Sequence, residues 1–265
     1  MNDSAWHPLV GLMRRFCVDW LSRADPIVPR EIMAPQYSIF IGGHTLAGRD
    51  DQYVPGTMTQ LRRFPGLLIC VHELFTTGEQ VAMRFTEHGP SVADGGRPAA
   101  WTGIGLFWWD GTQLTRNVTE EDYHSRRRQL ASGRSDPVDA PAAAPWSATP
   151  AEPNPAAEDA VRAWLADGDL ADNGAVLLDD GWCGQPTPPL LDVHDVGVAE
   201  LFSAGDRVAF HVVQAGRYLG GLPGTEGAEG REAELSAVGM VRVADGGVTG
   251  HVVRDRVGLR RRVRS

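Results

Sequence analysis

Three polar residues of one predicted strand have types and spacing that could do chemistry. Arg84, Thr86 and His88 alternate with Met83 and Phe85, so they share one face of an extended segment. If that face lines a cavity, the Arg84 guanidinium could bind a carboxylate or an enolate, and His88 could transfer a proton. Alternatively, the three form the polar, solvent-facing side of a strand whose other side is core. The pattern alone leaves both interpretations open.

A histidine in a turn and a set of aromatic side chains complete the candidates. His44 follows two glycines, at a turn where it could carry protons or simply be solvated. Aromatic residues offer flat apolar surface to a planar ligand, although most of them must belong to the core; the candidates are Trp20, Tyr37, Phe40, Phe64 and Trp101. No two histidines and a carboxylate stand at metal-binding spacing, so we expect neither a metal nor a cofactor.

The chain repeats itself, which determines where any site can lie. Residues 71–82 and 198–209 are identical at seven of twelve positions, at an offset of 127. Each copy ends in an arginine triplet, at residues 126–128 and 260–262. Self-similarity at this long spacing predicts two related domains rather than a solenoid, whose units are much shorter.

The spacing also predicts the domain limits and an asymmetry between the copies. We expect a first domain over residues 1–133, a Pro/Ala-rich linker over 134–156 and a second domain over 157–265. The second copy is 21 residues shorter between its opening helix and the repeated motif, and it gains a Gly/Glu-rich hairpin at Gly220–Glu234. It should therefore lack one wall of any cavity and carry a mobile flap.

Hydrophobic periodicity indicates the elements that would position these residues. An apolar stripe from Leu9 to Leu21 predicts an amphipathic helix. The expected elements that follow are a strand at 37–41, a short helix at 53–63, strands at 67–76, 80–88, 100–109 and 113–119, and a closing helix at 122–130. A long helix followed by a strand meander is an α+β pattern, with helices on one face of a curved, mostly antiparallel sheet.

The composition limits the classes of partner that we expect the protein to bind. The net charge is −9, so nucleic acid is not expected to bind, and all basic residues are arginine. The basic end at residues 254–264 could touch phosphate or acidic lipid, or could be a solvated helix. Three cysteines without metal-ligand spacing are typical of a reducing compartment, and no run approaches the roughly 18 apolar residues of a membrane span. We expect a cytoplasmic protein with no membrane partner.

The order of several motifs resembles a known family. The motifs are Gly48-Arg49-Asp50, Phe64-Pro65-Gly66, residues 73–84, Gly103-Ile104-Gly105-Leu106-Phe107, Asp110-Gly111, and Asp122 with Gln129-Leu130. Together they are similar to the SnoaL-like polyketide cyclases of the nuclear-transport-factor-2-like superfamily, over residues 9–131 and more loosely over 157–263. The resemblance implies tandem cone-shaped domains (cystatin-like α+β barrels), each a bent sheet wrapped around helices with an apolar pocket inside. It also implies an internal pseudo-dimer and allows a further homodimer.

The resemblance also implies a site. Asp122 holds the position of the family's acid/base residue, with Arg84 or Asn117 placed to steady an oxyanion; alternatively, Asp122 simply caps the closing helix. In the second copy Asp122 aligns with Arg256, and Asn117 aligns with His251. Cooperation between Asp122 and His251 across an interface would be one consequence.

Two function classes follow from this resemblance. One is a cofactor-free enzyme that cyclises, isomerises or dehydrates an apolar, polycyclic or polyketide-like carbonyl compound in the first domain, with the aromatic residues and His88 holding the ligand and His44 assisting proton transfer. The other is a non-catalytic module of the same fold that binds a ligand or a partner protein. The fold alone does not choose between them.

Overall fold

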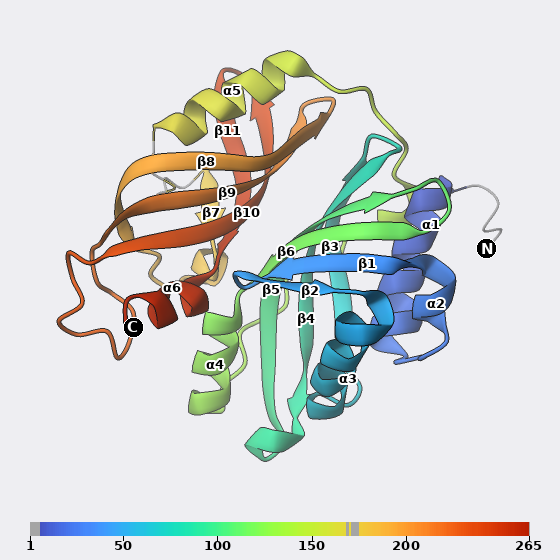
Figure 1. Ribbon diagram of the computed structural model, residues 1–265, viewed down its shortest axis with the longest axis horizontal. Helices are drawn as coiled ribbons and strands as arrows, with labels where there is room; N and C mark the ends of the chain where they lie inside the picture. The colour runs from blue at the N-terminus through green and yellow to red at the C-terminus, as the bar shows by residue number, and fades with distance from the viewer. Residues whose placement is uncertain (1–5, 168–169, 171–174, 265) are drawn as a thin grey trace.

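The chain folds into two α+β units, each built on its own bent sheet (Figure 1). The computed structural model describes residues 6–167, 170 and 175–264. The first sheet has the order β2-β1-β6-β5-β4-β3 and the second the order β7-β11-β10-β9-β8. In each sheet a parallel pair, β1 with β6 or β7 with β11, joins an otherwise antiparallel meander. The α+β class and its duplication are therefore as the sequence predicts.

The first unit contains the strands and helices that the periodicity indicates, together with β2 and α2, and all of the expected strands except β3 are longer than expected. Its strands are β1 (Met33–Ile41), β2 (His44–Ala47), β3 (Leu68–Thr76), β4 (Gln80–Ser91), β5 (Arg97–Trp109) and β6 (Leu114–Glu121). Its helices are α1 (Pro8–Arg14), η2 (Arg15–Ser22), α2 (Val28–Ile32), η3 (Arg49–Tyr53), α3 (Val54–Arg63), the short η4 (Val92–Asp94) and α4 (Tyr123–Ser132).

The second unit is a reduced version of the first. Its elements are α5 (Pro155–Ala166), β7 (Val176–Leu178), η6 (Gly181–Cys183), β8 (Leu191–Ala204), β9 (Arg207–Tyr218), β10 (Glu232–Ala244), β11 (Gly247–Arg254) and α6 (Arg256–Arg262). Between β7 and β8 it carries only η6, where the first unit has β2, η3 and α3. Trp164 of α5 packs edge-on against Phe210 at 5.9 Å, and α5 fills the inner side of the second sheet.

The opening helix of the first unit changes its pitch along its length. The apolar stripe begins on α1 and continues on η2, which is a π-helix. Phe16, Cys17, Trp20 and Leu21 of η2 are all buried. A π-helical stretch places successive turns at a different angle from an α-helix, so this broad group of side chains can face the sheet together.

The Gly-rich hairpin of the second unit is packed, which corrects the expectation of a mobile flap. Leu222 and Ala228 are buried in a cluster with Leu259 of α6. The Tyr218 hydroxyl accepts a hydrogen bond from the Leu222 backbone N–H at 2.9 Å and bonds to Thr225 at 2.8 Å. These contacts hold the loop because it carries apolar side chains among its glycines.

The two units meet through the outer faces of their sheets. This interface contains Phe75, Ala82, Ile104, Leu106 and Val118 from the first unit and Phe202, Ala204, Ala209, Val238, Met240 and Val253 from the second. The connecting segment also follows the edge strand β3, since Ala142 N–H donates to Val71 O at 2.8 Å and Ala151 N–H donates to Thr76 O at 3.1 Å. Even-numbered residues of β4 therefore face the second unit or the connecting segment, and odd-numbered ones face the helices.

Two glycines on β5 make room on the inner face of the first sheet. A Cβ atom on Gly103 would lie 2.4 Å from Phe85 Cζ and 3.1 Å from Glu121 Cγ. A Cβ atom on Gly105 would lie 2.7 Å from Phe107 Cε2. The bare backbone thus lets neighbouring side chains lie across the strand.

Replacing Gly103 by alanine should destabilise the protein. The Gly103→Ala methyl group cannot fit without moving Phe85, so we expect the free energy of unfolding in urea to fall by about 1–3 kcal/mol. Gly11→Ala is the matched control: Gly11 lies in α1, the position that an alanine methyl group would take there has nothing within 4 Å, and this change should be neutral or slightly stabilising. Equal effects of the two substitutions would contradict this account.

Candidate functional site

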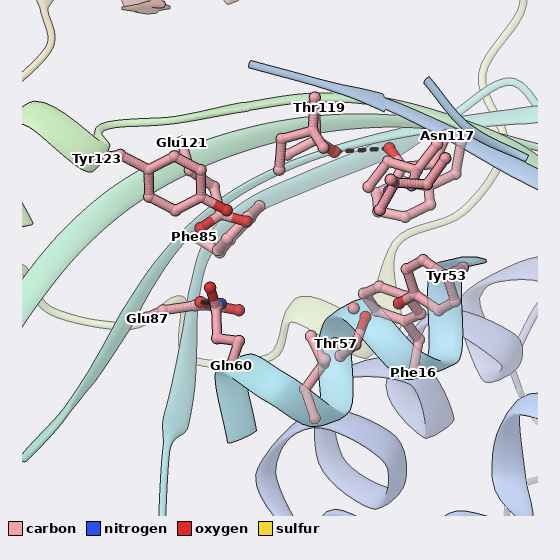
Figure 2. A pocket seen from close by; sticks show the side chains of 16 residues that line it. Phe16, Tyr53, Thr57, Gln60, Phe85, Glu87, Asn117, Thr119, Glu121 and Tyr123 are labelled. Atoms are coloured by element: carbon pink, nitrogen blue, oxygen red, sulfur yellow. Dashed lines mark hydrogen bonds between the residues drawn. The ribbon is translucent and has the colours of Figure 1, made fainter. Parts of the chain in front are cut away.

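A cavity of about 190 Å³ lies in the first unit, between the inner face of the sheet and the helices η2, η3 and α3 (Figure 2). Its lining comes from both the sheet and the helices: Phe16, Leu21, Ile39, Ile41, Leu46, Tyr53, Gly56, Thr57, Gln60, Phe85, Glu87, Phe107, Asn117, Thr119, Glu121 and Tyr123. Most of this lining is aliphatic or aromatic, which suits an apolar ligand held by a few polar groups.

Two carboxyl groups occupy one end of the cavity. Glu87 on β4 and Glu121 at the end of β6 flank the central strand β5, and both are buried, at 2% and 9% exposure. Gln60 Nε2 donates to Glu87 Oε2 at 2.7 Å. Trp101 Nε1 donates to Glu121 Oε2 at 2.7 Å. Each carboxyl is therefore oriented by a different neighbour, and Figure 2 shows Gln60 beside Glu87.

The environments of the two carboxyls differ in how strongly they favour the proton. Burial raises the pKa of Glu87 well above its ordinary value, and the nearby charge of Glu121 raises it further, although the Arg126 charge and the Gln60 hydrogen bond oppose the rise. Burial also raises the pKa of Glu121, but the Trp101 N–H and the Arg126 guanidinium oppose the rise. The pair titrates together, and we assign the first proton lost to Glu121.

The opposite end of the cavity carries amide and hydroxyl groups. Asn117 Oδ1 accepts a hydrogen bond from Thr119 Oγ1 at 2.6 Å. The Tyr53 hydroxyl accepts one from Trp20 Nε1 at 3.1 Å. Figure 2 shows these groups across the open space from Glu87 and Gln60. A ligand in this cavity would meet acids at one end and neutral hydrogen-bonding groups at the other.

The structure brings only part of the sequence-predicted set to this cavity. Asn117 lines it directly. Four predicted aromatic residues lie behind the lining and are fully buried: Trp20, Tyr37, Phe64 and Trp101. Trp20 and Trp101 support the lining groups Tyr53 and Glu121 by hydrogen bonds. These aromatic side chains position the site and do not form its surface.

The strand face that carries Arg84, Thr86 and His88 points away from the cavity. Arg84 pairs with Asp139 of the connecting segment at 3.4 Å. His88 lies 3.6 Å from Cys70, and burial lowers its pKa. The physical reason is the alternation of β4, which turns Phe85 and Glu87 inward and their neighbours outward.

Two further candidates also lie elsewhere. The Phe40 ring packs against His211 of the second unit, with 5.1 Å between ring centroids. His44 is exposed at the start of β2. Neither side chain is part of the cavity lining.

Asp122 is a helix cap and half of a buried ion pair. Its carboxylate accepts the Ser125 backbone N–H at 3.1 Å, and both of its oxygens lie 2.6 Å from Arg256 Nη2. Burial raises the pKa of Asp122 to about 6, and the charge of Arg256 opposes that rise. Asp122 is not among the lining residues, so the structure places it at the junction of the two units.

The strand registers correct the sequence alignment of the two copies. Asp255 caps α6 just as Asp122 caps α4, because Asp255 accepts the Gly258 N–H at 2.7 Å and its own N–H donates to Ser236 O at 2.8 Å. Asp122 is therefore equivalent to Asp255, not to Arg256. By the same register His251 is equivalent to Val118, not to Asn117. The charges that most affect His251 are those of Arg84, Asp139 and His72, so cooperation with Asp122 has no geometric support.

A buried cluster of charges surrounds this junction. Arg256 lies 2.8 Å from Asp180 and 3.3 Å from Asp179, in addition to Asp122. Arg254 pairs with Asp179 at 2.7 Å. The nearby charges raise the pKa of Arg256 despite its burial. Removing one partner from such a cluster would leave a buried charge unpaired, which is far costlier than losing a surface ion pair.

Glu87 and Glu121 were not among the predicted site residues; the polar candidates on β4 were Arg84 and His88, which lie on its other face. Phe85-x-Glu87 and Thr119-x-Glu121 each place an acid on the same strand face as a residue of the cavity lining, but the sequence does not show which face that is. Within the described ranges, no three His, Cys, Asp or Glu side chains are grouped to hold a metal ion. Within the same ranges, no helix combines the length and apolar character of a membrane span.

Comparison with solved structures gives distant similarities, each over about half of this chain. A protein from Jannaschia sp. CCS1 described as a SnoaL-like polyketide cyclase is 17% identical, with a TM-score of 0.44, over 50% of this chain and 97% of its own. One from Acidithiobacillus ferrooxidans described as a polyketide cyclase is 20% identical, with a TM-score of 0.42, over 47% and 95%. The polyketide cyclase IdmH of Streptomyces antibioticus, so described, is 21% identical, with a TM-score of 0.40, over 45% and 96%.

These proteins are of the group that the sequence resembles, and this likeness concerns the fold. No protein-family model matches the chain, and no curated protein matches it. The α+β cone seen in the first unit, with its bent sheet around helices, is the architecture that the resemblance implies.

The protonation of the acid pair should be visible in the pH dependence of stability. Because the pKa of Glu87 is raised in the folded protein, the folded state keeps a proton that the unfolded chain releases above pH ~4.3. This contribution to stability is complete below that pH and is lost as the pH rises through the folded pKa. Relative to wild type, Glu87→Gln should therefore gain stability as the pH rises, measured by urea unfolding between about pH 4 and 8.

The matched control for this measurement is Glu79→Gln, at an exposed turn residue before β4. Its stability profile should run parallel to that of wild type. A Glu87→Gln profile that also ran parallel to wild type would show that Glu87 titrates normally.

Proposed function

We propose that the first unit binds a compact apolar carbonyl compound and performs cofactor-free acid/base chemistry on it, as a cyclase, isomerase or dehydratase. The observation that carries the proposal is the pair Glu87 and Glu121, two carboxyls in different environments that face one largely apolar cavity. Acid pairs whose pKa values are pushed apart are a recurrent arrangement for proton transfer in both directions.

Each polar group of the cavity has a distinct role in this proposal. Glu121, the more readily ionised acid, removes a proton from the carbon next to the carbonyl, and the electron pair moves to the carbonyl oxygen as an enolate. The Asn117 side-chain amide stabilises that oxygen. Glu87, still protonated, then donates its proton to the carbon or leaving hydroxyl at which the reaction finishes.

The cavity volume limits the size of the ligand. About 190 Å³ is close to the ~150 Å³ of an engineered apolar cavity that takes up benzene. A ligand with one ring, or two small fused rings, fits this space better than the polycyclic compound expected from the sequence. The first substrates to try are therefore small ketones that carry one phenyl ring.

The second unit has no equivalent acid pair. By strand register Gln214 replaces Glu87, and Arg254 replaces Glu121 and is paired with Asp179. The inner side of that sheet is filled by α5. We infer that the second unit supports the first through the sheet interface and the Arg256 cluster, without chemistry of its own.

Exchange of hydrogen for deuterium tests the proposal without knowledge of the natural substrate. In heavy water, the enzyme should accelerate exchange at the carbon next to the carbonyl of phenylacetone, followed by proton NMR. Glu121→Gln should slow the catalysed exchange by about 10²–10⁴-fold, since general-base catalysis supplies a factor of this size.

Two further variants make this experiment discriminating. Asp122→Asn should keep most of the exchange activity if it remains folded, because Asp122 lies outside the cavity. Arg84→Gln should do the same. Activity that depends on Asp122 and not on Glu121 would contradict the assignment, and ketone binding without any exchange would favour a ligand carrier.

A further inference from the structure

Five arginines lie near one another, and one of them, Arg126, reaches the acidic end of the cavity. They are Arg63 of α3, Arg126 and Arg127 of α4, and Arg260 and Arg261 of α6, and we call them the arginine cluster. Helices α4 and α6 pack against each other, so the two arginine triplets of the sequence repeat come together at this place. The proposed acid/base chemistry assigns no proton transfer to any of these residues.

Arg126 connects the cluster to the cavity. Its guanidinium carbon lies 4.1 Å from the centroid of the Tyr123 ring, and its Nη1 donates to Gln60 Oε1 at 3.1 Å. Tyr123 and Gln60 both line the cavity, and Gln60 also donates to Glu87. Arg126 therefore spans from α4 to α3 directly beside the acid pair. Arg63 shares the Phe64 ring with it, each guanidinium carbon being 5.5 Å from the ring centroid.

The cluster carries more positive charge than its neighbours neutralise. Arg63 pairs with Asp94 at 2.8 Å, and Arg261 donates to the uncharged Gly42 carbonyl. Across the described residues, no carboxylate lies within ion-pair distance of Arg127, which is exposed.

The charge interactions of Arg127, Arg260 and Arg126 also bear on the net charge of the cluster. Burial and the charges of its four arginine neighbours lower the pKa of Arg127, which reflects their close spacing. Glu226 acts on Arg260 through its charge. Burial favours the protonated form of Glu87, which leaves Glu121 as the charged acid beside Arg126. A local surplus of positive charge thus exists on a protein whose net charge is −9.

We propose that the ligand of this cavity is an amphipathic organic anion, whose apolar body fills the cavity and whose carboxylate binds Arg126 and Arg127. This inference rests on the proposed function, and it narrows the substrate class to carbonyl compounds that bear an acid group. Arginine suits this task because its planar guanidinium matches the geometry of a carboxylate. The cluster would also raise the local concentration of such anions.

A matched pair of probes tests the inference by calorimetry. Phenylpropanoate and phenylpropanol share one apolar body and differ in the carboxylate. In low salt the acid should bind wild type about tenfold more tightly or better, as a charge-assisted hydrogen bond provides. About 0.5 M salt should narrow the difference, since the cluster is open to solvent.

Variants then test where the carboxylate and the apolar body of the probe bind. Arg127→Gln should remove most of the preference for the acid and leave alcohol binding unchanged, whereas Arg127→Lys should keep part of it. Arg134→Gln, at an exposed residue beyond α4, is the charge-matched control and should bind like wild type. Thr57→Phe, which places a larger side chain in the cavity wall, should weaken both probes.

The outcomes separate this inference from the proposed function. If both probes bind equally and Thr57→Phe weakens both, the cavity binds ligand but the anion site does not exist. If the acid binds better and Arg127→Gln does not change the preference, the inference is also overturned. If neither probe binds, the cavity assignment and the inference both fail.

Discussion

The packing of the two sheets against each other determines which side chains of the first sheet can contact a ligand. A strand offers its side chains to two faces, and in β4, β5 and β6 one face is taken by the second unit. Only the other face can enclose a ligand. Glu87, Asn117 and Glu121 are the polar residues of that face on these strands that reach the cavity, together with Thr119. The interface between the units therefore determines which face of the first sheet can form the ligand site.

Much of the fold could be predicted from the sequence. Which face of β4 lines the cavity could not. Periodicity and self-similarity give the α+β elements and their duplication, because these depend on local patterns. Strand alternation gives the sets Arg84/Thr86/His88 and Phe85/Glu87, but both faces of β4 are buried here, so polarity does not identify the inner one. The equivalence of Asp122 with Asp255 was also missed, because one residue more or less in a turn shifts every later pair.

The buried charges at the junction show the same dependence on tertiary structure. Asp122 has the sequence context of a helix cap and of the family's acid/base residue, and nothing local distinguishes the two. Its partner Arg256 lies in the other copy. A buried carboxylate is tolerated when a guanidinium and backbone donors compensate it, and Asp122 has both. A side chain occupied in this way holds two units together and is not available to a ligand.

The same cluster makes the two units non-interchangeable. By register the residue of the first unit that is equivalent to Arg256 is Tyr123, which serves the cavity. If two copies of the first unit met through this interface, each buried Asp122 would face a phenol in place of a guanidinium. Two identical first units would therefore leave each buried Asp122 without the guanidinium that compensates its charge.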